Sequence, residues 1–238
     1  MIGSIWQSTT SDRAWFVSIP KVATAMIVLP VFLQAPWVRI HPFSATLFTA
    51  VLIAAGITLN RSENQHSTDL GSLLVGFSGS WFAGCVFWGW LRAHPILHLP
   101  VEAFALPIAL AGLGNRWHLA SAFYLSSLLG TAFTDLMIAI TGVMRFWPTV
   151  VTASPNTAPQ LLHKAGLHLL HPLQLIALAA AIAIILWIAR ELSKLEIAPR
   201  CSTDTLSMSA SVLTTTLWVD GLFLLFALLQ PSLSGLIE

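Results

Sequence analysis

Long apolar runs alternate with short polar segments along this chain. Seven runs approach the roughly 20 residues that an α-helix needs to cross the hydrocarbon core of a bilayer. We therefore predict spans at residues 22–38, 42–59, 70–91, 95–114, 118–144, 172–189 and 212–229. The runs are continuous, whereas the strands of a β-barrel alternate polar and apolar residues. The predicted fold class is all-α, a single polytopic transmembrane helix bundle covering residues 1–238.

The first two runs leave the number of spans open. Only Arg39, Ile40 and His41 separate them. They form either two spans in a tight hairpin or one re-entrant unit, which gives seven or six spans. Prolines interrupt the first and fourth runs, at Pro30, Pro36, Pro100 and Pro107.

Composition agrees with a membrane protein. Hydrophobic residues make up 56% of the chain, charged residues 9%, and the mean hydropathy is +0.79. Soluble domains carry about 25% charged residues, so an ordinary soluble protein is excluded. Disorder is excluded too, because it needs low hydrophobicity and high charge. The net charge of +1 predicts no nucleic-acid partner and leaves membrane lipid as the expected partner.

Lysine and arginine predict the orientation, because cytoplasmic loops carry more of them. With seven spans, the larger group lies on the side of the N-terminus: Arg13, Lys21, Arg61, Arg116, Arg190, Lys194 and Arg200. The smaller group is Arg39, Arg92, Arg145 and Lys164. We therefore predict a cytoplasmic N-terminus and a C-terminus on the other side. The first residues lack a signal-peptide pattern, so the first run is expected to be retained.

Three carboxylates fall within predicted spans: Glu102, Asp135 and Asp220. A carboxylate in a bilayer needs a cation, hydrogen-bond donors or a proton, so such positions are functional candidates. Thr216 lies one turn before Asp220 on the same helix face. Asp135 and Asp220 are therefore candidates for proton or cation sites. The alternative stays open: a structural bond between helices, from Asp to Thr, Trp N–H or Arg.

Two spans carry patterned small or polar residues. A polar stripe at steps of three and four should face the bundle interior or a watery cavity, since lipid would not satisfy it. It contains Tyr124, Ser127, Thr131 and Asp135. The third span carries small residues at steps of four, which favours close helix packing over a pore lining. They are Ser72, Gly76, Ser80 and Gly84.

His94, His98 and Glu102 are spaced by four, so an unbroken helix would place them on one face. Imidazole with carboxylate suits a transition metal or a proton relay. Pro95 places His94 outside the helix, and Pro100 kinks it. We therefore favour a structural or interfacial His–Glu–Arg cluster, with Arg92 as the counter-ion of Glu102, over a metal site, and we predict no cofactor.

Residues outside the spans add three smaller predictions. Segment 161–171 is expected to lie along the membrane, with its histidines facing headgroups: His163, His168 and His171. An aromatic belt is expected at the span ends: Trp15, Trp37, Trp90, Trp117 and Trp147. Cys85 and Cys201 are expected to be free thiols.

The chain lacks the enzyme motifs GxSxG, HExxH, GxGxxG, the Walker loop and a DxxxD pair, so we predict that it is not an enzyme. Two segments, WLRAHPILHLPVEAFALP at 90–107 and FYLSSLLGTAFTDL at 123–136, resemble an uncharacterised family of cyanobacterial polytopic integral membrane proteins. The similarity is densest over residues 90–151. It implies a cyanobacterial plasma or thylakoid membrane, and it brings no established activity or catalytic residue.

Two functional hypotheses follow. In the first, the protein is a small-solute or ion permease that could be proton-coupled. Asp135 and Asp220 would bind a cation or proton, with His98 and Glu102 at a kinked gate. In the second, it is an accessory or assembly subunit of a photosynthetic membrane complex. The carboxylates would then be structural, and the tryptophan-rich face of the third span would bind a partner or pigment.

Overall fold

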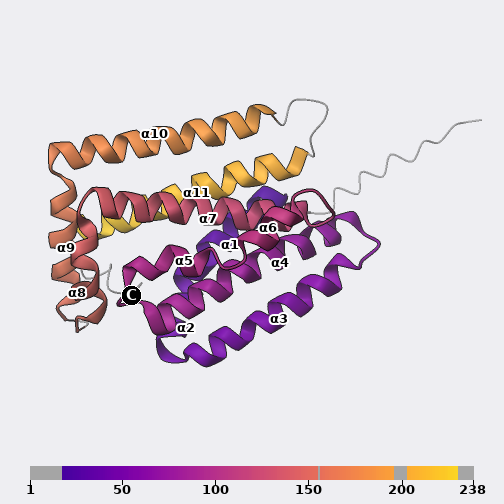
Figure 1. Ribbon diagram of the computed structural model, residues 1–238, viewed down its shortest axis with the longest axis horizontal. Coiled ribbons are helices and arrows are strands. Elements are labelled where there is room, and N and C mark those ends of the chain that lie inside the picture. Colours follow the sequence, from indigo (N-terminus) through magenta and orange to yellow (C-terminus); the bar gives the residue numbers. More distant parts are fainter. Residues whose placement is uncertain (1–17, 155, 196–202, 230–238) are drawn as a thin grey trace, which may run out of the picture.

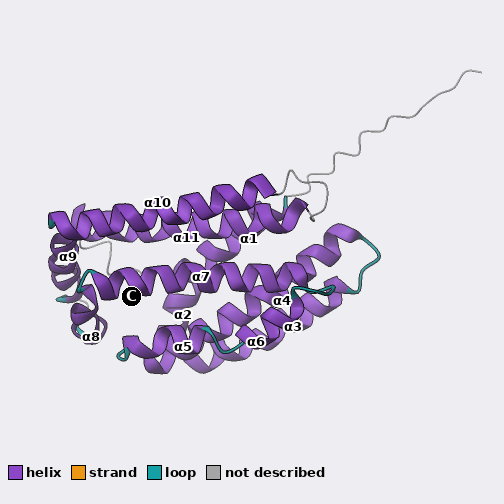
Figure 2. Ribbon diagram, turned by 45° about the horizontal axis from the view of Figure 1, so that its top comes forward, coloured by secondary structure: helices purple, strands orange, loops and turns teal. Residues whose placement is uncertain are grey.

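The structure is a computed structural model that describes residues 18–154, 156–195 and 203–229. Within these ranges the regular elements are helices, and seven are long and apolar enough to cross a membrane. Figure 1 shows most of them lying side by side along one direction, and Figure 2 shows the same bundle turned. The predicted all-α fold is confirmed. Some residues of the sequence predictions lie outside the described ranges: Arg13, Trp15, Arg200 and Cys201.

The spans follow the chain in order, and three of them consist of more than one helical piece. The first contains α1 (Ile19–Leu29), the π-helix η1 (Pro30–Gln34) and α2 (Ala35–Ile40). The next are α3 (Pro42–Asn60) and α4 (Gln65–Val86) with the π-helix η2 (Phe87–Leu91). The fourth contains η3 (Pro95–Leu97), α5 (His98–Glu102) and α6 (Leu106–Gly112). The last three are α7 (His118–Ile140), α10 (Pro172–Leu195) and α11 (Thr203–Leu229).

The first two runs form two spans. His41 leaves the helical conformation, with φ −138° and ψ 68°, and Pro42 begins α3. Proline suits the first helical position because it lacks the N–H group that would be unpaired there. The two helical stretches have 22 and 19 residues, each long enough to cross a bilayer.

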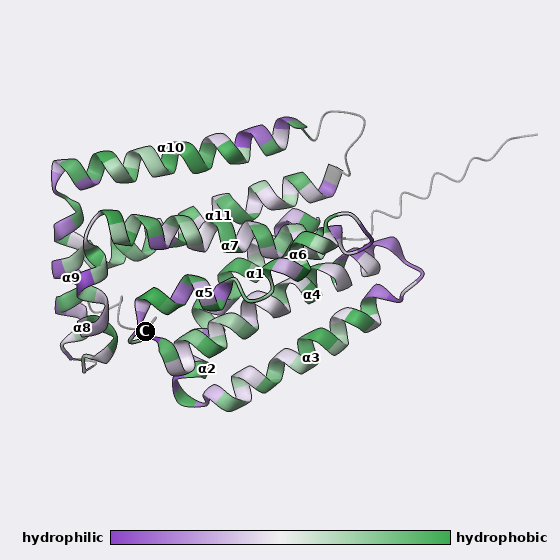
Figure 3. Cartoon of the chain, viewed as in Figure 1, coloured by the Kyte–Doolittle hydropathy of each residue, from purple (hydrophilic) through white to green (hydrophobic). Residues whose placement is uncertain are grey.

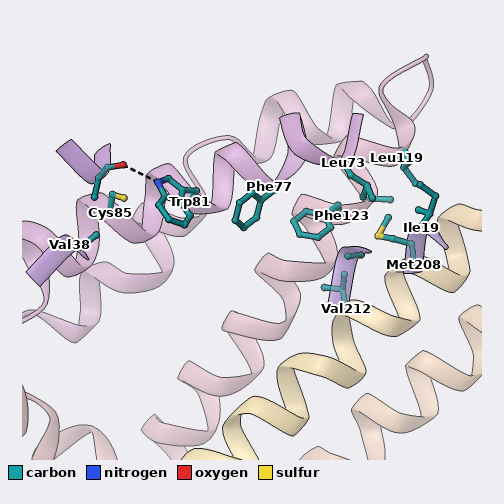
Figure 4. Close-up of a cluster of buried hydrophobic side chains, with 13 residues drawn as sticks. Ile19, Val38, Leu73, Phe77, Trp81, Cys85, Leu119, Phe123, Met208 and Val212 are labelled. Atoms are coloured by element: carbon teal, nitrogen blue, oxygen red, sulfur yellow. Dashed lines mark hydrogen bonds between the residues drawn. The ribbon is translucent and has the colours of Figure 1, made fainter. Parts of the chain in front are cut away.

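Helix α4 lies at the centre of the bundle. In its most apolar stretch, 61% of the residues are buried inside the bundle, against 17–22% in the other spans. Phe77 and Trp81 of α4 pack with Phe123 of α7 and Val212 of α11 in one hydrophobic cluster (Figure 4). Trp81 Nε1 donates a hydrogen bond of 3.0 Å to the backbone oxygen of Ala45 on α3. The bundle therefore encloses a hydrophobic core around α4.

The small residues of α4 serve helix packing. A Cβ atom added at Gly76 would overlap the backbone oxygen of Ala120 on α7 and lie 2.9 Å from its Cα. At Gly84 it would lie 3.1 Å from the amide atoms of buried Gln34. Ser72 Oγ accepts a 2.7 Å hydrogen bond from Asn60 Nδ2. The packing interpretation is therefore confirmed at these positions, which face neighbouring helices.

Two short helices, α8 (Trp147–Thr152) and α9 (Ala158–Leu169), cross one end of the bundle, after the 3₁₀ turn η4 (Val143–Phe146). Figure 1 shows α9 running across the direction of α7, α10 and α11, and Figure 3 shows α9 mixing hydrophilic and hydrophobic residues. This arrangement fits the predicted helix along the membrane surface.

The histidines of α9 differ from the prediction. His168 Nε2 lies 2.9 Å from the backbone oxygen of Thr141, beyond the end of α7. His163 Nδ1 lies 2.9 Å from the backbone oxygen of Ala227 on α11. Headgroup contact was therefore the wrong expectation for these two, because their ring nitrogens bond carbonyls that the helix ends leave unpaired. His171 is exposed.

Candidate functional site

The fourth span is broken between α5 and α6. Pro100 and Pro107 lack the N–H groups that would continue the helix, and residues 103–105 form turns. The phenol of Tyr124, on α7, bridges this break. It donates a hydrogen bond to the backbone oxygen of Glu102 and accepts one of 3.1 Å from the backbone nitrogen of Ala105. One residue of the polar stripe thus pairs backbone groups on both sides of the interruption.

His98 begins α5 and contacts Asp135 on α7. Its Nδ1 atom lies 2.9 Å from Oδ1 and 3.1 Å from Oδ2 of Asp135. Each side chain is only 13% exposed. An ionised carboxylate only accepts hydrogen bonds, so Nδ1 carries the proton in this pair.

Aromatic rings surround the imidazole of His98. The ring centroid of Phe87 lies 4.3 Å from that of His98, and those of Trp147 and Trp88 lie at 6.0 Å and 6.2 Å. Trp147 is held by a 2.7 Å hydrogen bond from Nε1 to the backbone oxygen of Arg92. These rings limit rotation of the imidazole and shield it from water. Trp147 therefore lines the site, although the sequence suggested only a place in the aromatic belt.

The other two intramembrane carboxylates lie near Asp135. Asp135 interacts electrostatically with Glu102, which is 8% exposed, and with Asp220. Thr134 Oγ1 donates a 2.6 Å hydrogen bond to Asp220 Oδ2. His98 also interacts electrostatically with Glu102. The structure thus brings three carboxylates and one histidine from the fourth, fifth and seventh spans into one cluster.

This charge arrangement restricts what the cluster can hold. Three neighbouring carboxylates cannot all stay ionised in a low-dielectric setting without compensation. A protonated His98 balances one of them, and the remainder need protons or a bound cation. Among the described residues, the ion pairs within 4.0 Å are His98–Asp135 and Lys194–Glu191, so Arg92 does not pair with Glu102. The cluster is therefore able to exchange protons or take up a cation.

The remaining candidate residues differ in their placement. Thr216 Oγ1 donates to the backbone oxygen of Val212 at 3.1 Å, and its side chain packs against Gly130, so it serves helix contact. Thr131 is half-buried on α7, one turn before Asp135. His94 is exposed in the turn before α5, outside the cluster. The described residues contain no group of three or more side chains arranged to hold a metal ion.

The cluster lies toward the end of the bundle that α8 and α9 cross. Asp135 is near the end of α7 at Ile140, and His98 begins α5. Asp220 lies at the level of Thr134, the neighbour of Asp135 on α7, because the Thr134 hydroxyl bonds its carboxylate. The ionisable groups therefore lie together in this half of the bundle.

Removing the hydroxyl of Tyr124 is expected to destabilise the protein. Tyr124→Phe leaves the Glu102 oxygen and the Ala105 nitrogen without their partner, which costs about 1–3 kcal/mol. Unfolding of the purified protein in detergent, followed by circular dichroism, measures the change. Thr152→Val is the control, because the exposed Thr152 hydroxyl bonds only within its own helix. Equal stability of the two variants would contradict the bridging role.

The fold and the cluster define a class: a polytopic helical membrane protein with an ionisable site inside its bundle. A family model described as "Protein of unknown function (DUF3120)" matches residues 23–228, and the chain belongs to this family. The match runs from α1 to α11 and so includes the whole cluster. The predicted membership of an uncharacterised family is confirmed. No curated protein and no solved structure matches the chain.

Proposed function

We propose that this protein is a proton-coupled permease for a small solute or ion. The observation that carries the proposal is the cluster of His98, Glu102, Asp135 and Asp220 on three spans. Ionisable residues are costly inside a membrane and mark ion and proton pathways. A purely structural contact between helices needs only one hydrogen-bonded pair of side chains. This cluster holds three carboxyl groups, and among the described residues only one of them pairs with a basic side chain, His98. The proposal assigns no enzymatic reaction.

The broken fourth span supports the same proposal. Transporters often use interrupted helices, because the freed backbone groups bind cargo and the break permits movement. Here the break lies directly after Glu102, so α5 can carry His98 and Glu102 relative to α6. Proton exchange at Asp135 would change the attraction between α5 and α7. That change would link protonation to opening of the gate.

We further propose the plasma or thylakoid membrane of a cyanobacterium, with the N-terminus in the cytoplasm. The excess of Lys and Arg on the side of the N-terminus supports this orientation. The cluster would then lie nearer the opposite, extracytoplasmic side, where α8 and α9 are located. Protons would enter the cluster from that side.

Reconstitution into liposomes that contain a pH-sensitive dye tests the proposal. Gradients of single cations and of small solutes are imposed, and proton movement is recorded per protein molecule. Asp220→Asn is expected to lower the flux by about tenfold or more, since the amide cannot take up a proton. Its amide can still bond Thr134, so abundance and melting temperature should stay unchanged. Asp69→Asn is the control, because Asp69 bonds Gln65 near the start of α4.

The accessory-subunit hypothesis rests on exposed aromatic residues. Trp81 is buried and Trp88 stacks on Trp147, so neither faces outward. Phe43 and Trp90 do face outward and pack together, with ring centroids 5.2 Å apart. Purification in mild detergent separates the hypotheses. A colourless monomer or small oligomer supports the permease; a large pigmented complex, or normal flux in Asp220→Asn, contradicts it.

A further inference from the structure

A polar cleft lies between α1, α10 and α11, away from the carboxylate cluster. Its volume is about 450 Å³. The polar residues that line it include Thr24, Arg190, Ser193, Ser207, Ser211 and Thr214. Thr215, the lining residue nearest to Asp220 on α11, is five residues from it, about 8 Å along the helix axis, and no residue of the carboxylate cluster lines the cleft. The cleft is therefore separate from the site proposed for transport.

Arg190 is the charged residue in the lining of this cleft. Arg190 is exposed, and among the described residues its guanidinium group has no hydrogen bond or ion pair. Its acidic neighbour Glu191 pairs with Lys194 at 2.6 Å. A guanidinium group offers five N–H donors in a planar fork that matches a phosphate. The cleft thus presents an uncompensated positive charge beside a cavity.

The hydroxyl groups of the lining fall into two sets. Ser193 and Thr214 donate to carbonyl oxygens of their own helices, at 3.0 Å and 2.7 Å. The described structure shows no such bond for the hydroxyls of Ser207 and Ser211, which lie one turn apart on α11. These two are therefore free to donate toward the cleft. Two hydroxyl donors and a guanidinium group favour an anion over a cation.

The depth of the cleft matches the phosphate layer of a membrane. Arg190 directly follows the uncharged run 172–189 of α10, and Ser207 lies one turn after the start of α11. Basic pockets between transmembrane helices at this level bind lipid headgroups. Asp204, one turn further out, is exposed and does not line the cleft.

We infer that this cleft binds a phosphate-bearing anion, with Arg190 as the main ligand and Ser207 and Ser211 as hydroxyl donors. The phosphate belongs either to an anionic lipid headgroup or to a free anion from solution. Both sources carry a phosphate with the same tetrahedral arrangement of oxygen atoms, so the same three side chains would bind either one. The inference is independent of the permease proposal, and Asp135→Asn should bind this anion as the wild type does.

The test measures binding to the full-length protein in detergent by native mass spectrometry and by thermal shift. The probes are phosphatidylglycerol, phosphatidylcholine and inorganic phosphate. Arg190→Gln is expected to weaken phosphatidylglycerol or phosphate binding by about tenfold or more, the usual loss for a charge-assisted bond. Lys194→Gln is the matched control, one turn away and outside the lining, and should bind as the wild type does.

Each outcome decides the inference. Preference for phosphatidylglycerol over phosphatidylcholine, lost in Arg190→Gln, supports the cleft and identifies a headgroup. Binding of inorganic phosphate with the same dependence on Arg190 supports it and identifies a free anion. Equal binding of both lipids by all variants, or equal losses in Arg190→Gln and Lys194→Gln, overturns it. If Arg190→Gln does not fold, Ser211→Ala replaces it, with an expected loss of about threefold.

Discussion

Replacing Asp135 with asparagine is expected to abolish proton-coupled flux, with a loss of about 100-fold or more, as when a proton-transferring side chain is removed. Asp135 contacts His98 directly and is the neighbour of Thr134, which bonds Asp220, so it links the ionisable groups of the fourth and seventh spans. Asparagine keeps the size of the side chain and can still hydrogen-bond Nδ1. The loss should therefore appear in flux per molecule and leave the amount of folded protein unchanged.

A double-mutant cycle makes this prediction specific. His98→Gln alone should also lower flux, and combining it with Asp135→Asn should lower flux little further, because the two residues act as a pair. Liposome flux normalised to reconstituted protein gives all four values. Losses that simply multiply would show that His98 and Asp135 act separately. Flux near the wild-type value in Asp135→Asn would refute the proposed proton site.

A large loss of stability is expected for Gly76→Ala. The new methyl group would overlap the Ala120 backbone, and backbone cannot rotate away as a flexible side chain can. Helices α4 and α7 would have to separate, at a cost of about 2–3 kcal/mol. Because α4 is the most buried span, the separation would weaken the entire core. Unfolding in detergent should show a much lower midpoint than the wild type.

Gly221→Ala is the matched control for Gly76→Ala. Gly221 is also helical, but a Cβ atom there would meet nothing within 4 Å. Alanine favours helix over glycine by about 1 kcal/mol, so this variant should be as stable as the wild type or slightly more stable. If Gly76→Ala and Gly221→Ala unfold at the same point, close packing of α4 against α7 is not what stabilises the bundle.

The spans could be predicted from sequence because lipid leaves a backbone no partner except its own helix. Their ends were less predictable. Helix α11 begins at Thr203, whereas hydropathy predicted residue 212. Residues 203–211 are rich in Ser and Thr, which give little apolar signal, so hydropathy did not include them. Met208 and Ala210 in this stretch are buried against the bundle, and this packing extends the helix.

The carboxylates of the site could be predicted, because charge inside a span is costly wherever it occurs. Their partners could not. His98 and Asp135 are 37 residues apart, and Thr134 and Asp220 are 86 apart, so only the packing of helices brings them together. Spacing by four grouped His94 with His98, but the turn at Pro95 leaves His94 outside the cluster. Periodicity describes one helix and carries no information about its neighbours.

The bridge that Tyr124 makes across the broken span has a spectroscopic consequence. Its phenol holds one backbone group on each side of the interruption, so movement of α5 relative to α6 must change the environment of that ring. The chain contains a single tyrosine. Isotope-labelled tyrosine would therefore give one nuclear magnetic resonance signal, free of overlap, from the joint itself. Following that signal across a pH titration would report opening of the joint directly, before any transported solute is known.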